Sequence, residues 1–446
     1  MRIVIAGAGE TGSHLAKMLS GTGHDITVID IEPKYLTEVT SLADVITVEG
    51  DCTAFATLRR AMVRKSDLFI AVLQRENDNI VSAVLAKQLG AKKAIARVDN
   101  NEYLEPNNKE IFINMGIDYL FYPEKAAAGE VINLLGHTAT SEYVDLSGGK
   151  LALVVFKLEP SSELIGQKLR GFSSEDEQLN YRTIAIARGG ETIIPQRDEI
   201  FMEGDVIYVI TRRESMAEVM NYSGKSNIEI KNMMVLGGSR IGIRVAAEMQ
   251  EQTNIKLIDY NAEKAYRLAE RLDKTLIINA DGRNTEVMLE EGLAHMDAFV
   301  AVTGRSETNI LAALLAKRMG VKKVIAEVEN LNYITLAESM GIDTIINKKL
   351  VTASNIFRFT MSTDVQAIKC LNGSDAEVLE FIVKPNSPAT KYSVRDLDLP
   401  RDVIIGGIVR DDRVMIATGG SVMNSYDRVV VFSMPASVSK IGSYFN

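Results

Sequence analysis

The chain has few of the residues that mark disulfide-rich, zinc-binding or membrane-spanning proteins. Its 446 residues include only two cysteines, Cys52 and Cys370, which are too few and too far apart for a disulfide framework or a zinc site. Such cysteine usage suits a reducing compartment. No apolar run approaches the roughly 18 residues that a bilayer-spanning helix needs, and the first residues do not resemble a signal peptide. We therefore expect a cytoplasmic protein that could still bind a membrane protein.

Basic clusters and grouped histidines are also scarce. The formal net charge is −9 and no basic patch stands out, which argues against a nucleic-acid-binding role. The four histidines are scattered and none stands beside acids at ligand spacing, so we predict no metal site. The hydrophobic content of 46% and charged content of 24% are those of a globular protein. This length predicts about two to four domains.

The strongest motif lies in the first thirty residues. An apolar strand leads into Gly7-Ala8-Gly9-Glu10-Thr11-Gly12, a helix begins near Thr11, and a second strand ends at Asp30. A glycine-rich G-x-G-x-x-G turn alone is weak evidence, but a strand before it, a helix after it and an acid beyond it form the dinucleotide-binding fingerprint. The sequence therefore predicts a nucleotide site at this turn.

Each residue of this motif has a distinct physical task. Gly7 allows the tight turn, Gly9 lets the backbone approach a pyrophosphate, and Gly12 lets the helix pack closely on the strand. The helix N-terminus favours phosphate through its unpaired N–H groups and its dipole. Asp30 can accept hydrogen bonds from ribose hydroxyls, and no cation follows it before Lys34. This favours NAD or adenine nucleotides over NADP.

Further candidates follow the later strands of the same segment. Asp51 either contacts the adenine or ribose or caps a turn, and the sequence favours neither. The backbone of Val72 and Leu73 should flank the adenosine, although their side chains could belong to the core. Arg97, at the end of a strand, is expected to reach a nucleotide phosphate or a subunit boundary, in preference to being merely solvated.

Strand and helix patterns alternate up to about residue 135, which predicts a mostly parallel sheet with helices on both faces. The predicted strands are Arg2–Ala6, Asp25–Ile29, Val45–Glu49, Leu68–Val72, Ala94–Val98 and Tyr119–Phe121, and the predicted helices include Thr57–Met62, Asn79–Leu89 and Pro123–Leu135. A small α+β module follows, with strands at Leu151–Leu158, Thr183–Arg188, Thr192–Pro195 and Asp205–Thr211 and a helix near Glu214–Asn221.

The whole pattern restarts 230 residues later. LAKQLGAKKAIARV at 85–98 nearly repeats as LAKRMGVKKVIAEV at 315–328, and Asp259 and Asp281 match Asp30 and Asp51. We predict an α/β protein built by tandem duplication of a Rossmann-like parallel-sheet domain followed by a small α+β domain. The predicted domains are 1–138, 139–222, 231–362 and 363–446, with a polar linker from residue 223 to 231.

The second glycine turn departs from the first. It reads Gly237-Gly238-Ser239-Arg240-Ile241-Gly242, so Ser239 replaces the middle glycine and Arg240 replaces Glu10. Glu327 stands where the first repeat has Arg97. The two sites should therefore differ in ligand or in occupancy. One possibility is a dinucleotide in the first and a triphosphate or diphosphate nucleotide in the second; the other is a second site that binds weakly or stays empty.

These segments, GAGETGSHLA, ITVID, EGDCT and LAKQLGAKKAIARV, together with the second glycine turn, resemble the TrkA family of peripheral subunits of bacterial Trk potassium uptake systems, over essentially the whole chain. Members carry two RCK (KTN) domains, each with a Rossmann-like half and a smaller C-terminal half. The resemblance implies nucleotide contacts at Gly7, Ala8, Gly9, Glu10, Thr11, Asp30, Val72, Leu73 and Arg97, and in the second repeat at Gly237, Gly238, Ser239, Arg240, Ile241 and Asp259.

The resemblance also implies a regulatory function without catalysis. Such proteins form a ring, commonly a homotetramer, beneath a channel-like potassium-transport subunit of the TrkH/TrkG type at the inner face of the cell membrane. NAD(H), ATP or ADP would be regulatory ligands that change the shape of the ring. A regulator of a different ion transporter is one alternative. An NAD-dependent oxidoreductase is another, but the segments 141–220 and 366–446 contain no histidine to serve as an acid–base residue.

Overall fold

The computed structural model describes residues 1–21, 24–169, 180–196, 198–222, 224, 227–330, 332–342, 344–357, 359, 365–371 and 376–446. It divides into two compact units. The first unit consists of Met1–Ala126 and Lys349–Thr363, and the second consists of Ala127–Lys348 and Asp364–Asn446.

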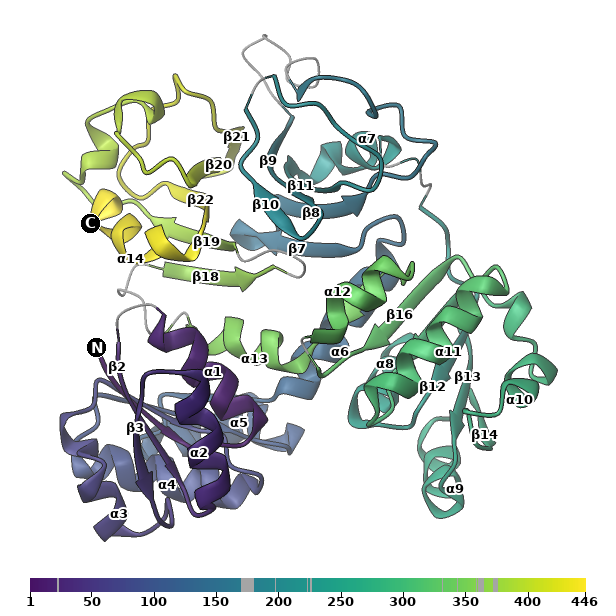
Figure 1. Ribbon diagram of the computed structural model, residues 1–446, viewed down its shortest axis with the longest axis horizontal. Coiled ribbons are helices and arrows are strands. Elements are labelled where there is room, and N and C mark those ends of the chain that lie inside the picture. Colours follow the sequence, from purple (N-terminus) through teal and green to yellow (C-terminus); the bar gives the residue numbers. More distant parts are fainter. Residues whose placement is uncertain are drawn as a thin grey trace. The chain divides into compact units, whose positions relative to one another are not determined.

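The first unit contains a parallel six-stranded sheet in the order β3-β2-β1-β4-β5-β6 (Figure 1). This is the Rossmann order, in which the strand order reverses between β1 and β4 and leaves a crevice at the carboxyl ends of the strands. The predicted strands are all present, with ends that differ by one residue at most. The elements are β1 (Arg2–Ala6), α1 (Glu10–Ser20), β2 (Asp25–Asp30), α2 (Pro33–Leu42), β3 (Ile46–Glu49), α3 (Phe55–Arg60), β4 (Leu68–Ala71), α4 (Glu76–Leu89), β5 (Lys93–Arg97), α5 (Pro106–Asn114) and β6 (Tyr119–Phe121).

The second unit contains a parallel sheet of the same order, β14-β13-β12-β15-β16-β17. The predicted duplication of the Rossmann-like domain is therefore confirmed. Its elements are β12 (Asn232–Leu236), α8 (Arg240–Met249), β13 (Asn254–Asp259), α9 (Ala262–Arg271), β14 (Thr275–Asn279), α10 (Thr285–Glu290), β15 (Ala298–Ala301), α11 (Ser306–Arg318), β16 (Lys323–Glu327), α12 (Asn332–Ser339) and β17 (Thr344–Ile346).

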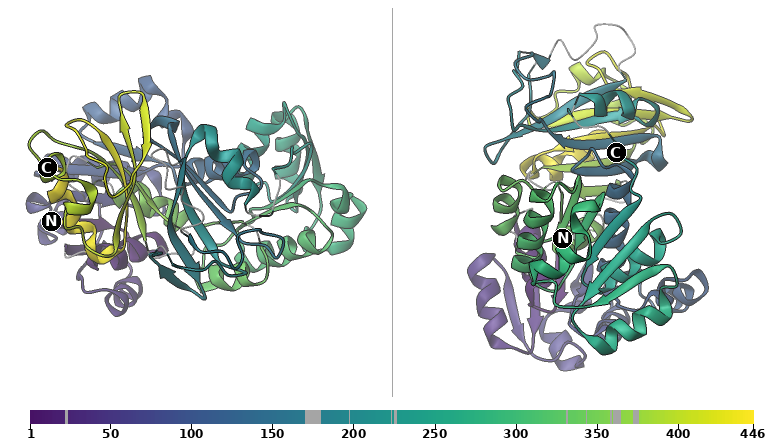
Figure 2. Two further views of the ribbon diagram at one scale, coloured as in Figure 1. Left: turned by 90° about the horizontal axis from the view of Figure 1, so that it is seen from above. Right: turned by 90° about the vertical axis from the view of Figure 1, so that its right-hand side faces the viewer.

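Two antiparallel five-stranded sheets complete the second unit, in the orders β10-β9-β11-β8-β7 and β18-β19-β22-β20-β21. They lie side by side in Figures 1 and 2 and share one apolar cluster that includes Leu153, Tyr208, Val378 and Phe432. Their elements are β7 (Glu142–Leu146), β8 (Leu151–Lys157), β9 (Tyr181–Arg188), β10 (Glu191–Ile193), β11 (Val206–Arg212), α7 (Met216–Asn221), β18 (Val365–Cys370), β19 (Glu377–Ile382), β20 (Val403–Arg410), β21 (Arg413–Ile416), β22 (Arg428–Ser433) and α14 (Pro435–Phe445).

The sequence analysis did not predict the edge strand β7, because charged residues interrupt its apolar pattern. Glu142 is charged yet only 5% exposed, whereas Asp145 on the same strand is exposed. The strand therefore lacks the alternation of polar and apolar residues that identifies a half-buried strand. Across the described ranges, no helix combines the length and the apolar character that a bilayer-spanning segment needs.

The helix that follows each parallel sheet is exchanged between the repeats. From Ala127 onward, α6 (Pro123–Gly136) belongs to the second unit, where Val131 and Leu135 share an apolar cluster with Met233 of β12. From Lys349 onward, α13 (Lys348–Phe357) belongs to the first unit. Each sheet thus receives a helix from the other repeat. The predicted domain boundaries stay predictions, and the one at 362/363 lies outside the described residues.

Beyond α13, the chain still contacts the first sheet. The ring of Phe359 lies 4.9 Å from that of Tyr119 in β6, and the Lys93 ammonium lies 5.9 Å from the centre of the Phe359 ring. Aromatic pairs and cation–π contacts at these distances are favourable. They hold the end of this helical segment against the first unit.

Candidate nucleotide sites

The three glycines of the first turn have different neighbours. Gly7 has a φ of +108°, and a Cβ there would lie 3.0 Å from the Val72 carbonyl oxygen. A Cβ on Gly12 would lie 1.8 Å from the Gly7 carbonyl oxygen, which the backbone cannot accommodate. A Cβ on Gly9 would meet nothing within 4 Å. Gly7 and Gly12 are therefore required by the turn itself, whereas Gly9 leaves free space at the N-terminus of α1.

Asp30 supports this turn from the end of β2. Its carboxylate is buried, and its two oxygens accept the backbone N–H groups of Ala8 at 2.6 Å and Glu32 at 2.9 Å. A carboxylate offers about four acceptor positions. Asp30 thus retains acceptor capacity for ribose hydroxyls while it fixes the turn that would face the phosphates.

Asn79 holds the loop after β4 and was not singled out as a site residue from the sequence. Its side-chain oxygen accepts the Leu73 N–H at 2.6 Å, and its amide nitrogen donates to the carbonyl oxygens of Leu73 and Arg97. Asn309 makes the matching bonds to Thr303 and Glu327. The signal in the sequence was an identical amide at the same position of the two repeats. Asn79 positions the Leu73 backbone that was predicted to flank the adenosine, and Asn309 holds the matching backbone of the second repeat.

Asp51 follows the carboxyl end of the edge strand β3, and Arg97 ends β5 on the other side of the central strands. One Asp51 oxygen accepts the backbone N–H and the hydroxyl of Thr53, both at 2.7 Å, so the carboxylate caps a turn. An Arg97 Nη2 lies 3.3 Å from Asp99 and 3.4 Å from Glu124. The guanidinium is thus paired with two acids, and its contact with a phosphate stays a prediction.

The second turn repeats the first with one change of mechanism. Asp259 accepts the Gly238 N–H at 2.9 Å, as Asp30 does for Ala8. Ser239, however, accepts the Gly242 N–H at 3.3 Å through its hydroxyl and so caps α8. In the first repeat Gly9 provides no side-chain cap. One N–H group that would face a phosphate is therefore already satisfied in the second turn.

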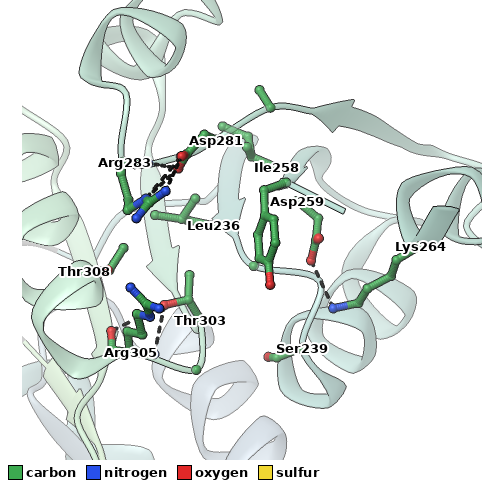
Figure 3. A pocket seen from close by; sticks show the side chains of 15 residues that line it. Leu236, Ser239, Ile258, Asp259, Lys264, Asp281, Arg283, Thr303, Arg305 and Thr308 are labelled. Atoms are coloured by element: carbon green, nitrogen blue, oxygen red, sulfur yellow. Dashed lines mark hydrogen bonds and ion pairs between the residues drawn. The ribbon is translucent and has the colours of Figure 1, made fainter. Parts of the chain in front are cut away.

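A cavity of about 410 Å³ opens beside this second turn (Figure 3). Its volume lies within the usual range for small-molecule sites, about 300–1,000 Å³. The cavity is lined by Leu236, Gly237, Ser239, Ile258, Asp259, Tyr260, Lys264, Ala280, Asp281, Gly282, Arg283, Thr303, Gly304, Arg305 and Thr308.

The sequence analysis missed three cations of this cavity, Lys264, Arg283 and Arg305. Arg305 matches Arg75 of the first repeat, whereas Lys264 and Arg283 match no cation there. Lys264 lies 3.0 Å from Asp259, and Arg283 forms a two-pronged pair with Asp281 that lowers the pKa of this carboxyl to about 2. Repeat alignment places Tyr35 and Thr53 at the matching positions of the first repeat. Comparison of the repeats residue by residue could have found both. The second site therefore carries two positive charges that the first lacks.

The ion pair at the end of β5 is reversed in the second repeat. Arg97 pairs with Glu124 in the first repeat, whereas Glu327 pairs with Lys348 in the second. Glu327 is buried at the end of β16, and Lys348 at the start of α13 lies 3.0 Å from both Glu327 and Glu329. Burial raises the pKa of Glu327, and the neighbouring Glu329 raises it further, whereas the Lys348 ammonium lowers it. In the first repeat the cation stands on the strand; in the second it stands on the helix.

Cys52, which follows Asp51, is not a reactive thiol. Cys52 is buried close to the Ile29 carbonyl, and burial raises the pKa of its thiol to about 12, so it is not a thiolate at neutral pH. Among the described residues, no three His, Cys, Asp or Glu side chains are grouped to hold a metal ion.

Comparison with known families agrees with this duplicated arrangement. The TrkA-N domain model matches residues 3–123 and 233–348, each containing one glycine turn, and the TrkA-C domain model matches residues 153–224 and 378–446. This chain belongs to the TrkA family. The resemblance carried by the glycine turns and the repeated segments is confirmed.

Relatives match the TrkA-family chain along its whole length. It is 31% identical over 455 residues to "Trk system potassium uptake protein TrkA homolog 2" of Methanosarcina mazei, covering 100% of both chains. It is 30% identical over 438 residues to the TrkA protein of Haemophilus influenzae, covering 97% of this chain and 95% of that one.

Solved structures share its fold. The GsuK channel matches with a TM-score of 0.62 at 16% identity, and "GsuK channel bound to NAD" with 0.61 at 17%; both comparisons cover 99% of this chain and 78% of the other. Identities this low show the RCK fold alone.

Proposed function

We propose that this TrkA-family chain is a nucleotide-sensing regulatory subunit that gates a channel-like potassium-transport protein of the membrane. The observation that carries the proposal is a pair of unequal glycine turns on one chain, each with its buried acid. Two unequal sites suit a protein whose conformations are selected by bound ligands. The curated relatives named Trk potassium uptake proteins support the transport role.

The proposed assembly is a homotetrameric ring on the cytoplasmic face of the membrane, bound to a TrkH/TrkG-like subunit. The proposal follows the family, and a structural neighbour of the same fold is described as a channel bound to NAD. A ligand whose binding free energy differs by a few kcal/mol between two ring conformations shifts their populations, because each 1.4 kcal/mol changes the equilibrium about tenfold.

The first site would take NAD(H) or an adenine nucleotide. Asp30 is the feature that supports this ligand, since an acid at the end of the second strand suits a free ribose 2′-hydroxyl. The free space above Gly9 leaves room for a pyrophosphate at the N-terminus of α1.

The second site would take ATP or ADP in preference to a dinucleotide. Lys264, Arg283 and Arg305 line its cavity together with only two carboxylates, Asp259 and Asp281. A surplus of cations favours ligands with more phosphate charge. The hydroxyl cap of Ser239 removes one backbone donor, so side-chain cations would supply more of the phosphate binding.

The decisive experiment measures binding of the chain to a potassium-transport subunit and potassium flux through the pair. The full chain should be retained by a detergent-solubilised TrkH-type subunit, and potassium flux through the reconstituted pair should change when ATP, ADP or NADH is added. Retention without any nucleotide effect on flux, or no retention at all, would reject the gating proposal. Absorbance of NADH at 340 nm, followed with small carbonyl compounds, checks the oxidoreductase alternative; steady oxidation would favour it.

A further inference from the structure

A lysine from the second repeat reaches the first glycine turn. The Lys349 ammonium, near the start of α13, lies 3.0 Å from a carboxylate oxygen of Glu10, the first residue of α1. Both residues belong to the first unit. The Lys349 side chain is only 13% exposed, whereas that of Glu10 is 77% exposed. The mostly covered side chain of Lys349 thus places its ammonium beside the helix N-terminus that the proposed nucleotide would approach.

The turn itself supplies no positive side chain. Its residues, Gly7 to Gly12, include one charge, the carboxylate of Glu10, which opposes an approaching phosphate. His14, one turn further along α1, remains neutral because burial and the nearby Lys349 lower its pKa to about 4. Among the charged groups described at this turn, Lys349 is therefore the cation placed to offset phosphate charge.

The charges at these two positions changed together between the repeats. Arg240 stands at the position of Glu10 in the second turn, and Glu124 stands at the position of Lys349 at the start of α6. A single chain thus carries opposite signs at both positions.

We propose that Lys349 is the phosphate-binding cation of the first nucleotide site, shared between Glu10 when the site is empty and the nucleotide when it is filled. This inference rests on the proposed nucleotide binding. Phosphate at the N-terminus of α1 repels Glu10 and attracts Lys349, so the ammonium transfers from the carboxylate to the phosphate oxygens. The nucleotide of the first repeat is then read by α13, a helix encoded in the second.

The two partners of this ion pair should have opposite effects on binding. Lys349→Met removes the phosphate cation and should weaken ATP binding about tenfold, the effect of losing one charge-assisted contact. Glu10→Gln removes the competing carboxylate and should strengthen ATP binding. Adenosine, which has no phosphate, should bind both variants as it binds the wild type. If the pair were only structural, losing either half would have the same effect.

Hydrogen exchange of the full-length protein resolves the two sites. Protection of peptides covering residues 7–19 is titrated with ATP and with adenosine, separately from peptides covering 237–249. Lys65→Met is the charge control, because Lys65 precedes the amino end of β4, at the opposite end of the strands from the glycine turn. If Lys349→Met proves unstable, Lys349→Arg should retain the protection by ATP.

Equal or same-direction shifts for Lys349→Met and Glu10→Gln would overturn the role of Lys349 while leaving nucleotide binding intact. If ATP does not protect residues 7–19 of the wild type, the role of Lys349 is rejected, and if NADH does not protect them either, the proposed first site is rejected as well.

Discussion

Because space is free beside Gly9, a substitution there should change nucleotide binding without destabilising the fold. Gly9 has φ −62° and ψ −176°, and Ser239 holds nearly the same angles in the second turn. Serine can therefore replace glycine at position 9 without backbone strain. The new Cβ would meet no protein atom within 4 Å. Gly9→Ser should leave stability unchanged or raise it by about 0.4–1 kcal/mol, since the unfolded chain loses freedom.

Binding of NAD should respond in the opposite way. The added side chain occupies the space where a pyrophosphate would approach, and forcing extra atoms into a filled space costs about 1–3 kcal/mol. This corresponds to an affinity loss of about fivefold to 150-fold at the first turn. Ser239→Gly, which opens the second turn and frees the Gly242 N–H, should improve NAD binding there.

Photolabelling with an azido-adenine NAD analogue, followed by peptide mapping, assigns the label to the adenosine pocket of the first or of the second repeat. Gly21→Ser is the matched control, because Gly21 lies at the other end of α1 and a Cβ there meets nothing closer than 3.6 Å. Unchanged first-turn labelling by Gly9→Ser, with competition by NAD as in the wild type, would refute the placement of the pyrophosphate over Gly9.

Three other substitutions test the supports of the sites and of the small module. Asp30→Ala should weaken adenosine binding at the first turn in calorimetry while the domain stays folded, although losing the acceptor for the Ala8 N–H should cost about 1.5–3 kcal/mol. Asn79→Ala leaves the Leu73 N–H without its acceptor and should destabilise the first unit by about 2–4 kcal/mol in urea unfolding; a change below 1 kcal/mol would contradict the clamp. Burial raises the pKa of Glu377 to about 7, above the ordinary 4.5, so the folded protein holds this proton more tightly than the unfolded chain does. The free energy of unfolding should therefore fall as pH rises from 4.5 to 7. In urea unfolding, Glu377→Gln should be more stable than the wild type at pH 8, by up to about 3 kcal/mol, but not at pH 4.

Local sequence motifs were enough to predict most of the fold and part of the candidate sites. The turn from Gly7 to Gly12, the acid at Asp30 and the repeat of both are predictable because short-range spacing determines them. Helical periodicity likewise predicts α6, but it cannot say which sheet the helix covers. That choice depends on which apolar surface is left open elsewhere in the chain.

Contacts between distant residues were not predictable in the same way. Lys349 pairs with Glu10 although 339 positions separate them, and no local pattern reports such a pair. Lys264 lies only five residues after Asp259, yet a lysine there is typical of an exposed helix face. Its role appears only when the cavity shows that the side chain turns back toward the acid.

The exchange of α6 and α13 bears on how such a chain can evolve. A single repeat on its own would expose the apolar face of α6, including Val131 and Leu135, and could cover its sheet only by trading helices with a second copy. Two identical copies would necessarily carry the same residue at both glycine turns. Fusion removes that symmetry constraint. Glu10 and Arg240 can then diverge, each together with the residue on the exchanged helix. A fused chain can therefore have two different sensing sites, whereas a symmetric dimer of identical copies cannot.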